Sequence, residues 1–481
     1  MAKSISRNYL YNVSYQLLTL LTPFITTPYL SRVLGPDGIG IYSYTTSIVS
    51  YFILFSTLGL ANYGQREIAY HRDDPYLQSR TFFEIVLLRF ILVGINLVAY
   101  YSIIRFSVGD RLIYWIQALN IVAVLFDISW FFQGLEEFGK IVFRNFVIKI
   151  INIGLIFLLV KESSDVSKYV LLIGIMNILS GISIWFFLPQ YLIHVPLGAL
   201  RPFRNLRVII ELFLPQIAIQ IYTVLDKTMI GLITGSSFEN GYYEQAEKVV
   251  KLSLTVVTSL GTVVLPRVAH SFAKQKYDEI KKLMFQSYQF VWFITIPMCF
   301  GLMGIAQNFV PWFFGPGYAN VVSLIQILSV LTIAIALSNV TGIQYLLPTN
   351  QQNHLTVSVV CGAIVNCFLN AMLIKRNGAV GAAIASIIAE LVVTFVQFYF
   401  VRHVFSFGNV LKLSIKYWIA GSFMLAGICF LGRHFAPAPI YTVHLILMGF
   451  LIYSSILLLL RDSMVFMLVK KLRSSALHKN G

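Results

Sequence analysis

The amino-acid sequence predicts an all-α integral membrane protein with about fourteen transmembrane helices. Of its 481 residues, 57% are hydrophobic and only 12% are charged, whereas soluble domains carry about 25% charged residues. A helix needs roughly 20 apolar residues to cross the hydrocarbon core of a bilayer. The connections between the apolar runs are short, so we expect no separate soluble domain.

The apolar runs of spanning length follow one another from the N-terminus to the C-terminus. They lie near residues 10–31, 40–64, 81–104, 112–134, 141–160, 169–193, 208–234, 242–266, 284–307, 320–346, 355–374, 379–401, 413–432 and 441–460.

Lys and Arg indicate the orientation of these runs. They concentrate in alternate connections, beginning with the segment before the first run, and this group includes Lys140 and Arg144. Because positively charged connections stay in the cytoplasm, we expect a protein of the cytoplasmic membrane with both termini inside. The net charge of +16 is then mostly a topology signal. Anionic membrane lipids are the expected partners of the inner loops, and no basic domain is present to bind nucleic acid.

A trace of an internal repeat indicates the domain organisation. Similar residues recur at an offset of about 200 positions, namely Gly35, Tyr42, Gly59, Arg66 and Ala69, then Gly235, Tyr243, Gly261, Arg267 and Ala269. Six helices per repeat would give two halves of the same orientation. We predict a six-helix lobe over residues 1–195, a second over 205–403, and two additional helices with a cytoplasmic tail over 410–481.

Ionisable residues at membrane depth are costly and are therefore candidates for function. Lys149 lies near the middle of the fifth run, and the spacing places Asn145 and Asn152 on the same helical face. Arg89 and Asp127 lie at similar depth on adjacent antiparallel helices. They could form a buried ion pair or could serve a substrate.

The seventh run carries a polar stripe of Gln216, Gln220, Thr223 and Lys227, while Asp226 points about 100° away from Lys227.

The eighth run pairs Glu244 with Lys248 and Glu247 with Lys251 at a spacing of four. Such pairs are often intrahelical salt bridges, although Lys251 is expected at a depth comparable to that of Lys227. In the twelfth run, Glu390 is either a protonated, hydrogen-bonded carboxyl group or a coupling site. The first run has a polar face that includes Asn12 and would line a hydrated cavity or a helix contact.

Together these residues predict a central cavity that suits an anionic ligand, especially a phosphate or diphosphate. The candidate binding cations are Arg89, Lys149, Lys227 and Lys251, and the candidate coupling or pairing carboxylates are Asp127, Asp226, Glu247 and Glu390. The four cysteines lie in apolar runs without the spacing of metal ligands, so no metal, redox site or cofactor is expected.

The first two predicted helices carry a more specific pattern. It comprises Pro23, the run PYLSRVLG from Pro28 to Gly35, then Gly38, Gly40–Tyr42 and the stretch from Gly59 to Ala69. This pattern resembles the start of the polysaccharide repeat-unit flippases, a family within the multidrug/oligosaccharidyl-lipid/polysaccharide exporter superfamily. Chain length, helix number and short loops are similar along the whole chain.

The resemblance implies a twelve-helix core of two lobes around a central cavity, plus two extra helices. It also implies translocation of undecaprenyl-diphosphate-linked oligosaccharide to the outer leaflet by alternating access, for a capsule, exopolysaccharide or O-antigen. Glycosyltransferases and a polymerase would be partners. Related lipid II flippases use arginines early in the first helix for the diphosphate, but the apolar centre of that helix has none here. Arg32 lies at its outer end.

Two other functions share some of these features. A cation-coupled multidrug exporter of the same superfamily would have the same fold, but such exporters usually rely on intramembrane carboxylates, and here the mid-span cations match or outnumber the acids. A membrane polysaccharide polymerase would need a substantial outer loop with catalytic groups, and the outer loops are short. We therefore expect a transporter, without catalytic residues, rather than an enzyme.

Overall fold

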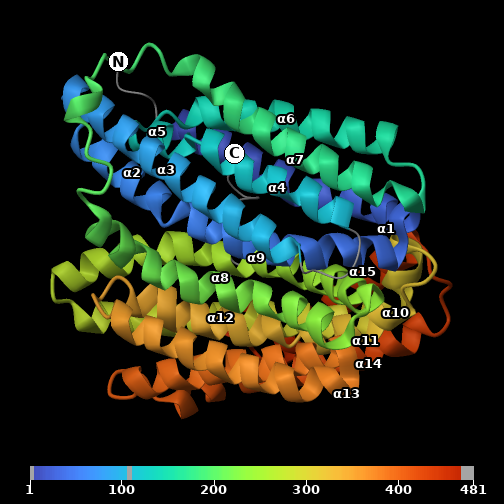
Figure 1. Ribbon diagram of the computed structural model, residues 1–481. Helices are drawn as coiled ribbons and strands as arrows, with labels where there is room; N and C mark the ends of the chain where they lie inside the picture. Colours follow the sequence, from blue (N-terminus) through green and yellow to red (C-terminus); the bar gives the residue numbers. More distant parts are fainter. Residues whose placement is uncertain (1–4, 106–110, 467–481) are drawn as a thin grey trace, which may run out of the picture. The chain divides into compact units, whose positions relative to one another are not determined.

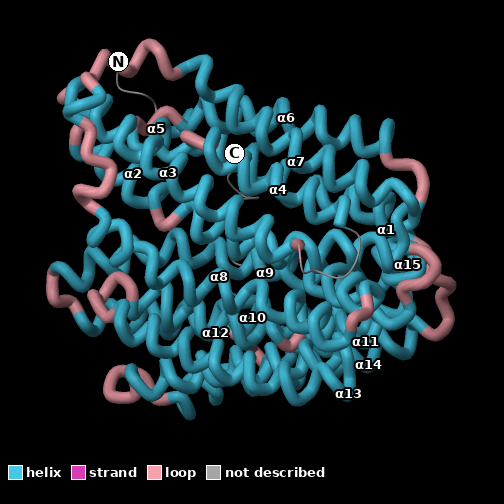
Figure 2. The backbone as a smooth tube through the Cα atoms, viewed as in Figure 1, coloured by secondary structure: helices cyan, strands magenta, loops and turns pink. Residues whose placement is uncertain are grey.

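The computed structural model describes residues 5–105 and 111–466, although the side chains of residues 5–18 and 20 and several within 214–222 and 256–263 lie outside the description. All regular structure in the described ranges is helical (Figure 1). Figure 2 shows that most connections are short, and the longest described one, 188–205, contains the short helix η3 (Leu197–Ala199) and leads to α8. The prediction of an all-α fold is confirmed.

The chain forms two compact units, Met1–Thr228 (unit 1) and Met229–Gly481 (unit 2). The boundary lies inside a helix, whereas the sequence places the limit between lobes at 195–205. The lobe limits 1–195, 205–403 and 410–481 stay predictions.

Unit 1 consists of long helices interrupted at a few defined points. Its elements are α1 (Ile5–Thr57), α2 (Leu60–Tyr70), α3 (Pro75–Ile104), α4 (Arg111–Phe126), α5 (Ser129–Gly134), α6 (Phe138–Leu159), η1 (Ser163–Asp165), α7 (Val166–Ser183), η2 (Ile184–Phe187), η3 (Leu197–Ala199) and the first part of α8 (Leu206–Thr234).

Two glycines explain why the first two predicted runs differ from the helices observed. Gly35, with φ 66° and ψ 177°, interrupts the helical backbone of α1, so that α1 consists of two helices joined at a kink. Gly59, with φ 71°, is the N-cap residue directly before α2. These backbone angles are readily available only to glycine. The predicted run 40–64 therefore ends α1 and continues into α2.

Unit 2 has a similar build. Its elements are α9 (Ser237–Ala273), α10 (Tyr277–Phe314), α11 (Ala319–Leu328), α12 (Leu331–Thr341), the π-helical turn η4 (Gly342–Leu346), α13 (Gln352–Val401), α14 (Phe407–Gly432) and α15 (Pro439–Leu459). A kink at Gly378, with φ 52°, divides α13 into the two predicted runs 355–374 and 379–401. Glu239 stabilises this kink, because its Oε2 accepts a hydrogen bond of 2.6 Å from the backbone N–H of Ala379.

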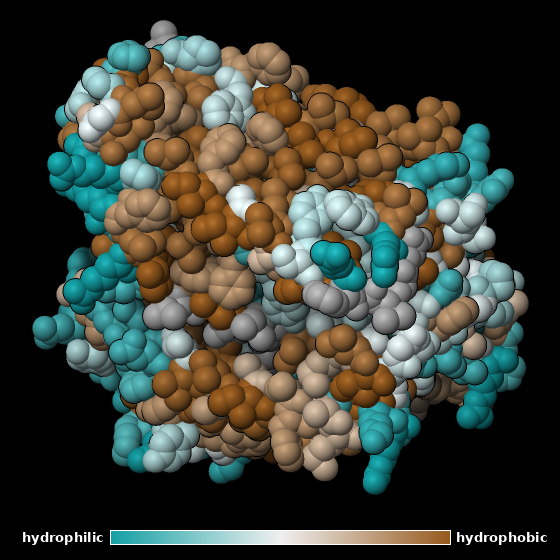
Figure 3. Space-filling view, in the orientation of Figure 1, coloured by the Kyte–Doolittle hydropathy of each residue, from teal (hydrophilic) through white to brown (hydrophobic). Residues whose placement is uncertain are grey.

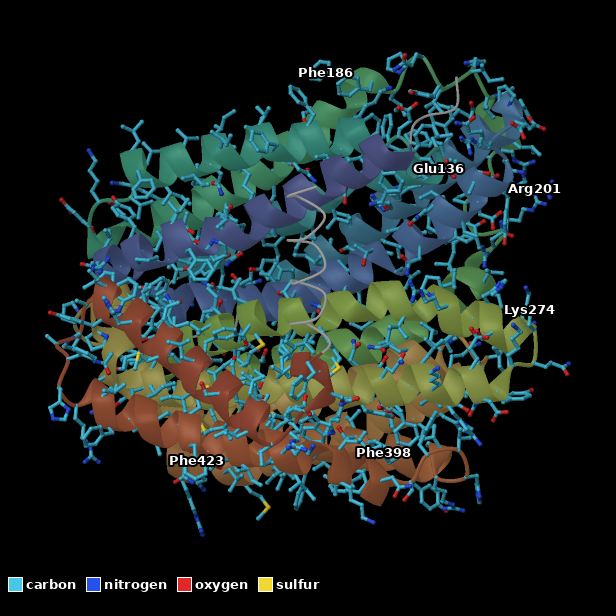
Figure 4. All side chains as sticks on the ribbon, turned by 180° about the vertical axis from the view of Figure 1, so that it is seen from behind. Glu136, Phe186, Arg201, Lys274, Phe398 and Phe423 are labelled. Atoms are coloured by element: carbon cyan, nitrogen blue, oxygen red, sulfur yellow. The ribbon has the colours of Figure 1, made fainter. Side chains whose placement is uncertain are left out.

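The described residues include ten helical segments long and apolar enough to span a membrane, and those through α1 and α13 each hold two predicted runs. Their outer faces are apolar: where Figure 1 places α6 and α7, the surface in Figure 3 is almost continuously hydrophobic. Figure 4 labels Phe423, which is 61% exposed on α14, and Phe398, which is 4% exposed in the core of unit 2. A lipid environment explains such exposed aromatic side chains. The chain is a multi-pass membrane protein.

Candidate functional site

Unit 1 contains a cavity of about 670 Å³ where α3 to α7 approach the end of α1 and the start of α2. Its apolar lining includes Ile53 and Val124. Its polar lining comes from separate helices and consists mainly of Arg89, Asn120, Asp127, Ser129, Gln133, Arg144, Asn145 and Asn177. Three predicted site residues, Arg89, Asp127 and Asn145, therefore meet in one cavity.

The Arg89 side chain binds backbone carbonyls at the C-terminal end of α4. It is 3% exposed, and its Nη1 donates hydrogen bonds to the backbone oxygens of Val124, at 3.2 Å, and of Asp127. These carbonyls lie at the C-terminal end of α4, where helical partners are missing. The Nε of Arg89 is buried without a hydrogen-bond partner among the described residues. The guanidinium also lies 6.0 Å from the centre of the Trp130 ring.

The Asp127 carboxylate does not form the ion pair with Arg89 that the sequence leaves open. Its Oδ1 instead accepts hydrogen bonds from the backbone N–H of Ser129 at 3.0 Å and from the Ser129 hydroxyl at 2.5 Å. The difference arises because α4 stops at Phe126, so that the main chain of Asp127, rather than its side chain, faces Arg89.

Arg144 is a second cavity arginine, which sequence reasoning assigned to a cytoplasmic connection. Its Nη2 donates to Ser129 Oγ at 3.2 Å, and its Nε and Nη2 donate to Asn145 Oδ1 at 3.0 and 2.7 Å. Arg144 is 9% exposed. Its position inside the apolar run 141–160 and next to Asn145 is the signal that could have identified it. Arg89 and Arg144 therefore converge on the α4–α5 break from two different helices.

A relay of side-chain hydrogen bonds also reaches the cavity. Asn177 Nδ2 donates to Asn120 Oδ1 at 2.8 Å, and Asn120 Nδ2 donates to Gln117 Oε1 at 2.8 Å. Gln117 is fully buried, and its Nε2 donates to the hydroxyls of Thr45 and Thr46 on α1. Sequence reasoning missed this relay, although Gln117 and Asn120 are polar residues three apart in an apolar run.

The remaining predicted residues of α6 lie outside the cavity lining. Lys149 Nζ donates to Thr19 Oγ1 on α1 at 3.1 Å. Asn152 Oδ1 is buried and has no hydrogen-bond partner among the described residues. The side chain of Asn12 lies outside the described residues. Lys149 thus contacts the polar face of α1 that the sequence predicts.

The predicted residues of α8 in unit 1 also lie outside the lining of this cavity. Asp226 is 7% exposed, and Lys227 and Gln220 are partly buried. The side chain of Gln216 is among those not described.

In unit 2, two lysines of α9 lie near glutamates of the same helix. Lys251 Nζ lies 2.8 Å from Glu247, and Lys248 Nζ lies 3.8 Å from Glu244. These are the intrahelical salt bridges that the spacing of four allows. Glu390, 8% exposed on α13, is buried as expected for either of its predicted roles.

Three aromatic rings surround Lys140, which lies between the cavity-lining residues Phe138 and Ile141 in the sequence. Lys140 Nζ donates to Tyr191 OH at 2.6 Å and lies within 6 Å of the centres of the Phe132, Phe187 and Tyr191 rings. Burial, together with the hydrogen bond to Glu137, raises the pKa of Tyr191 to about 12. The Tyr191 hydroxyl donates a hydrogen bond to Glu137 Oε1 at 3.0 Å.

Comparison with known proteins places the chain in a family. Residues 5–272, more than half of the chain, match the model of the family described as polysaccharide biosynthesis protein. The chain belongs to this family. The match includes the first two helices, which carry the resemblance drawn from the sequence.

Two curated relatives align with most of the chain. One is named as an O-antigen transporter of Escherichia coli K12, with 24% identity over 83% of this chain and 97% of the relative. The other is named as the low-salt glycan biosynthesis flippase Agl15 of Haloferax volcanii, with 22% identity over 85% of each chain. These names are those of transporters, which agrees with the expectation that this member of the polysaccharide biosynthesis protein family is not an enzyme.

Two solved structures show a similar fold. The lipid II flippase MurJ in an inward closed conformation has a TM-score of 0.70 and 15% identity, with 95% of this chain and 99% of that chain covered. An inward-facing multidrug resistance transporter of the MATE family has a TM-score of 0.64 and 13% identity, with 83% and 95% covered. At this identity the likeness shows the fold alone.

Proposed function

We propose that the chain is a flippase that translocates undecaprenyl-diphosphate-linked oligosaccharide repeat units to the outer leaflet of the cytoplasmic membrane for polysaccharide biosynthesis. The convergence of Arg89 and Arg144 on one cavity carries the proposal. Guanidinium groups present several N–H donors in a planar fork that matches phosphate oxygens. The names of the curated relatives support a lipid-linked glycan as the cargo.

The cavity suits a glycosyl diphosphate in both charge and chemistry. With two arginines and one carboxylate in its polar lining, its formal charge favours an anion. The nearby carboxamides of Asn120, Asn145 and Asn177 offer the donors and acceptors that sugar hydroxyl groups need. Low dielectric strengthens the attraction to the diphosphate, so the cavity must admit water or change shape for release. Alternating access by rigid-body movement of two lobes would supply that change.

The first test measures export in cells that lack the protein. We expect loss of surface polysaccharide and accumulation of intact lipid-linked repeat units on the cytoplasmic leaflet. Normal polysaccharide together with new sensitivity to cationic dyes would instead indicate a multidrug exporter. Units that cross the membrane without being lengthened would indicate a polymerase.

A charge reversal tests Lys149 as a further cation on the path of the cargo. Lys149→Glu is expected to abolish export while the protein still inserts, because a carboxylate repels the diphosphate where an ammonium attracts it. Lys149→Gln, which keeps a donor to Thr19 without the charge, is the matched control and should retain part of the export. Normal export by a well-inserted Lys149→Glu protein would show that Lys149 does not lie on the path of the cargo.

A further inference from the structure

The hydrogen-bond relay of α7, α4 and α1 has a fixed direction. Thr45 Oγ1 donates its one hydroxyl hydrogen to the backbone oxygen of Ile41 at 2.8 Å, so towards Gln117 it can only accept. Gln117 must therefore present its Nε2 to α1 and its Oε1 to Asn120. This backbone anchor settles the orientation of an amide that would otherwise be ambiguous.

The direction set at Thr45 extends to the cavity. Asn120 Nδ2 donates a hydrogen bond to Gln117, so Asn120 Oδ1 faces Asn177 and accepts a hydrogen bond from Asn177 Nδ2 at 2.8 Å. Asn177 is itself exposed and lines the cavity. Its Oδ1 has no hydrogen-bond partner among the described residues, and reversing this amide would bring two oxygens together at Asn120. The relay thus holds a hydrogen-bond acceptor at the wall of the cavity.

We propose that Asn177 is a specificity-determining residue, whose Oδ1 accepts a hydrogen bond from an N–H or O–H donor on the sugar attached to the diphosphate. This inference rests on the proposed function and deepens it. Arg89 and Arg144 supply only donors, which serve phosphate oxygens and do not select among sugars. The fixed acceptor of Asn177 favours a sugar with a hydroxyl or acetamido donor next to the diphosphate. A lipid diphosphate without a sugar makes no such contact.

The test measures the affinity of the purified full-length protein for two probes in lipid nanodiscs. The probes are undecaprenyl diphosphate and undecaprenyl diphosphate carrying one N-acetylglucosamine. We expect wild-type protein to bind the sugar-bearing probe about tenfold more tightly, the scale of one hydrogen bond in a closed site. Asn177→Leu should lose this preference and leave the affinity for the bare diphosphate unchanged.

Asn96→Leu is the matched control, because among the described residues Asn96 donates only to Leu92 O on its own helix α3, and it does not line the cavity. It should keep the full preference for the sugar-bearing probe. Asn120→Leu removes the group that orients Asn177, so the preference should fall in part. Asn177→Ala is a smaller change with the same expected result as Asn177→Leu, should the leucine variant insert poorly.

Each result separates the sugar contact from the diphosphate site. An equal loss of affinity for both probes in Asn177→Leu and Asn177→Ala would show a structural role and overturn the proposal. Retained preference in both variants, or no preference in the wild type, would also overturn it. Arg144→Gln should weaken the binding of both probes alike. If Arg144→Gln binds bare undecaprenyl diphosphate normally, the diphosphate site proposed above fails, whatever Asn177 does.

Discussion

In unit 1 the charged groups of two helices meet, whereas in unit 2 two lysines of α9 pair with glutamates on the same helix. Arg89 of α3 and Arg144 of α6 both reach the break between α4 and α5. On α9, by contrast, Lys251 and its partner Glu247 are one turn apart. Pairs one turn apart form wherever the helix forms. Arginines that converge from different helices require the tertiary fold and bring a desolvation cost.

The comparison shows why a membrane cation alone is a weak sign of function. Lys251 was predicted from the same reasoning as Arg89, yet its side chain is 52% exposed and its partner is local. Arg89 is buried, and one of its nitrogens lacks a partner among the described residues. A buried donor of that kind is more informative, because leaving it unpaired is costly unless a ligand or water binds there.

The largest expected effect comes from Arg89→Leu in unit 1. The substitution leaves the Val124 and Asp127 carbonyls without their donor, and each buried unsatisfied group costs about 1–3 kcal/mol. We expect a clearly lower midpoint in thermal unfolding of the purified protein, together with loss of export. Arg89→Lys keeps the charge but bridges two carbonyls less effectively. Its unfolding midpoint should therefore lie between those of the wild type and Arg89→Leu. An unchanged midpoint for Arg89→Leu would show that α4 ends stably without it.

An intermediate effect is expected where the two units kink a long helix with glycine. A Cβ on Gly378 would lie 2.3 Å from Glu239 Oε2, whereas a Cβ on Gly35 would meet no atom within 4 Å. Both alanine variants adopt an unfavourable positive φ, at a cost of about 1–3 kcal/mol, but only Gly378→Ala also disturbs the bond from Ala379 to Glu239. Thermal unfolding should show the larger loss for Gly378→Ala. Equal losses would mean that Glu239 moves aside freely.

The smallest effect is expected for Lys251→Gln in unit 2. The Lys251 side chain is 52% exposed, and an ion pair at the surface contributes about 0–1 kcal/mol, so the unfolding midpoint should hardly change. Export should also stay within about twofold of the wild type. Glu247→Gln is the reciprocal control. A strong loss of export in Lys251→Gln with normal insertion would contradict the comparison, since it would place a substrate cation in unit 2.

Local patterns explain which parts of the site could be predicted. Depth and charge in the sequence identified Arg89 and Asp127, and helical spacing identified Asn145. The same reasoning assigned Arg144 to a loop, because a cation near the end of an apolar run resembles a topology signal. It also left open an ion pair between Arg89 and Asp127, since nothing local shows that α4 ends at Phe126 and presents backbone oxygens instead.

By itself, the sequence determined that this protein is an all-helical membrane protein with many spanning runs, and it indicated the family. Each apolar run predicts a helix by itself, because a backbone in lipid must satisfy its own hydrogen bonds. Only the tertiary structure decided which polar faces meet. Arg89 and Val124 are 35 residues apart, and Asn177 and Asn120 are 57 apart. Contacts at such separations depend on how the helices pack. Hydrophobic patterns constrain this packing only weakly, because lipid is as apolar as the core of the protein.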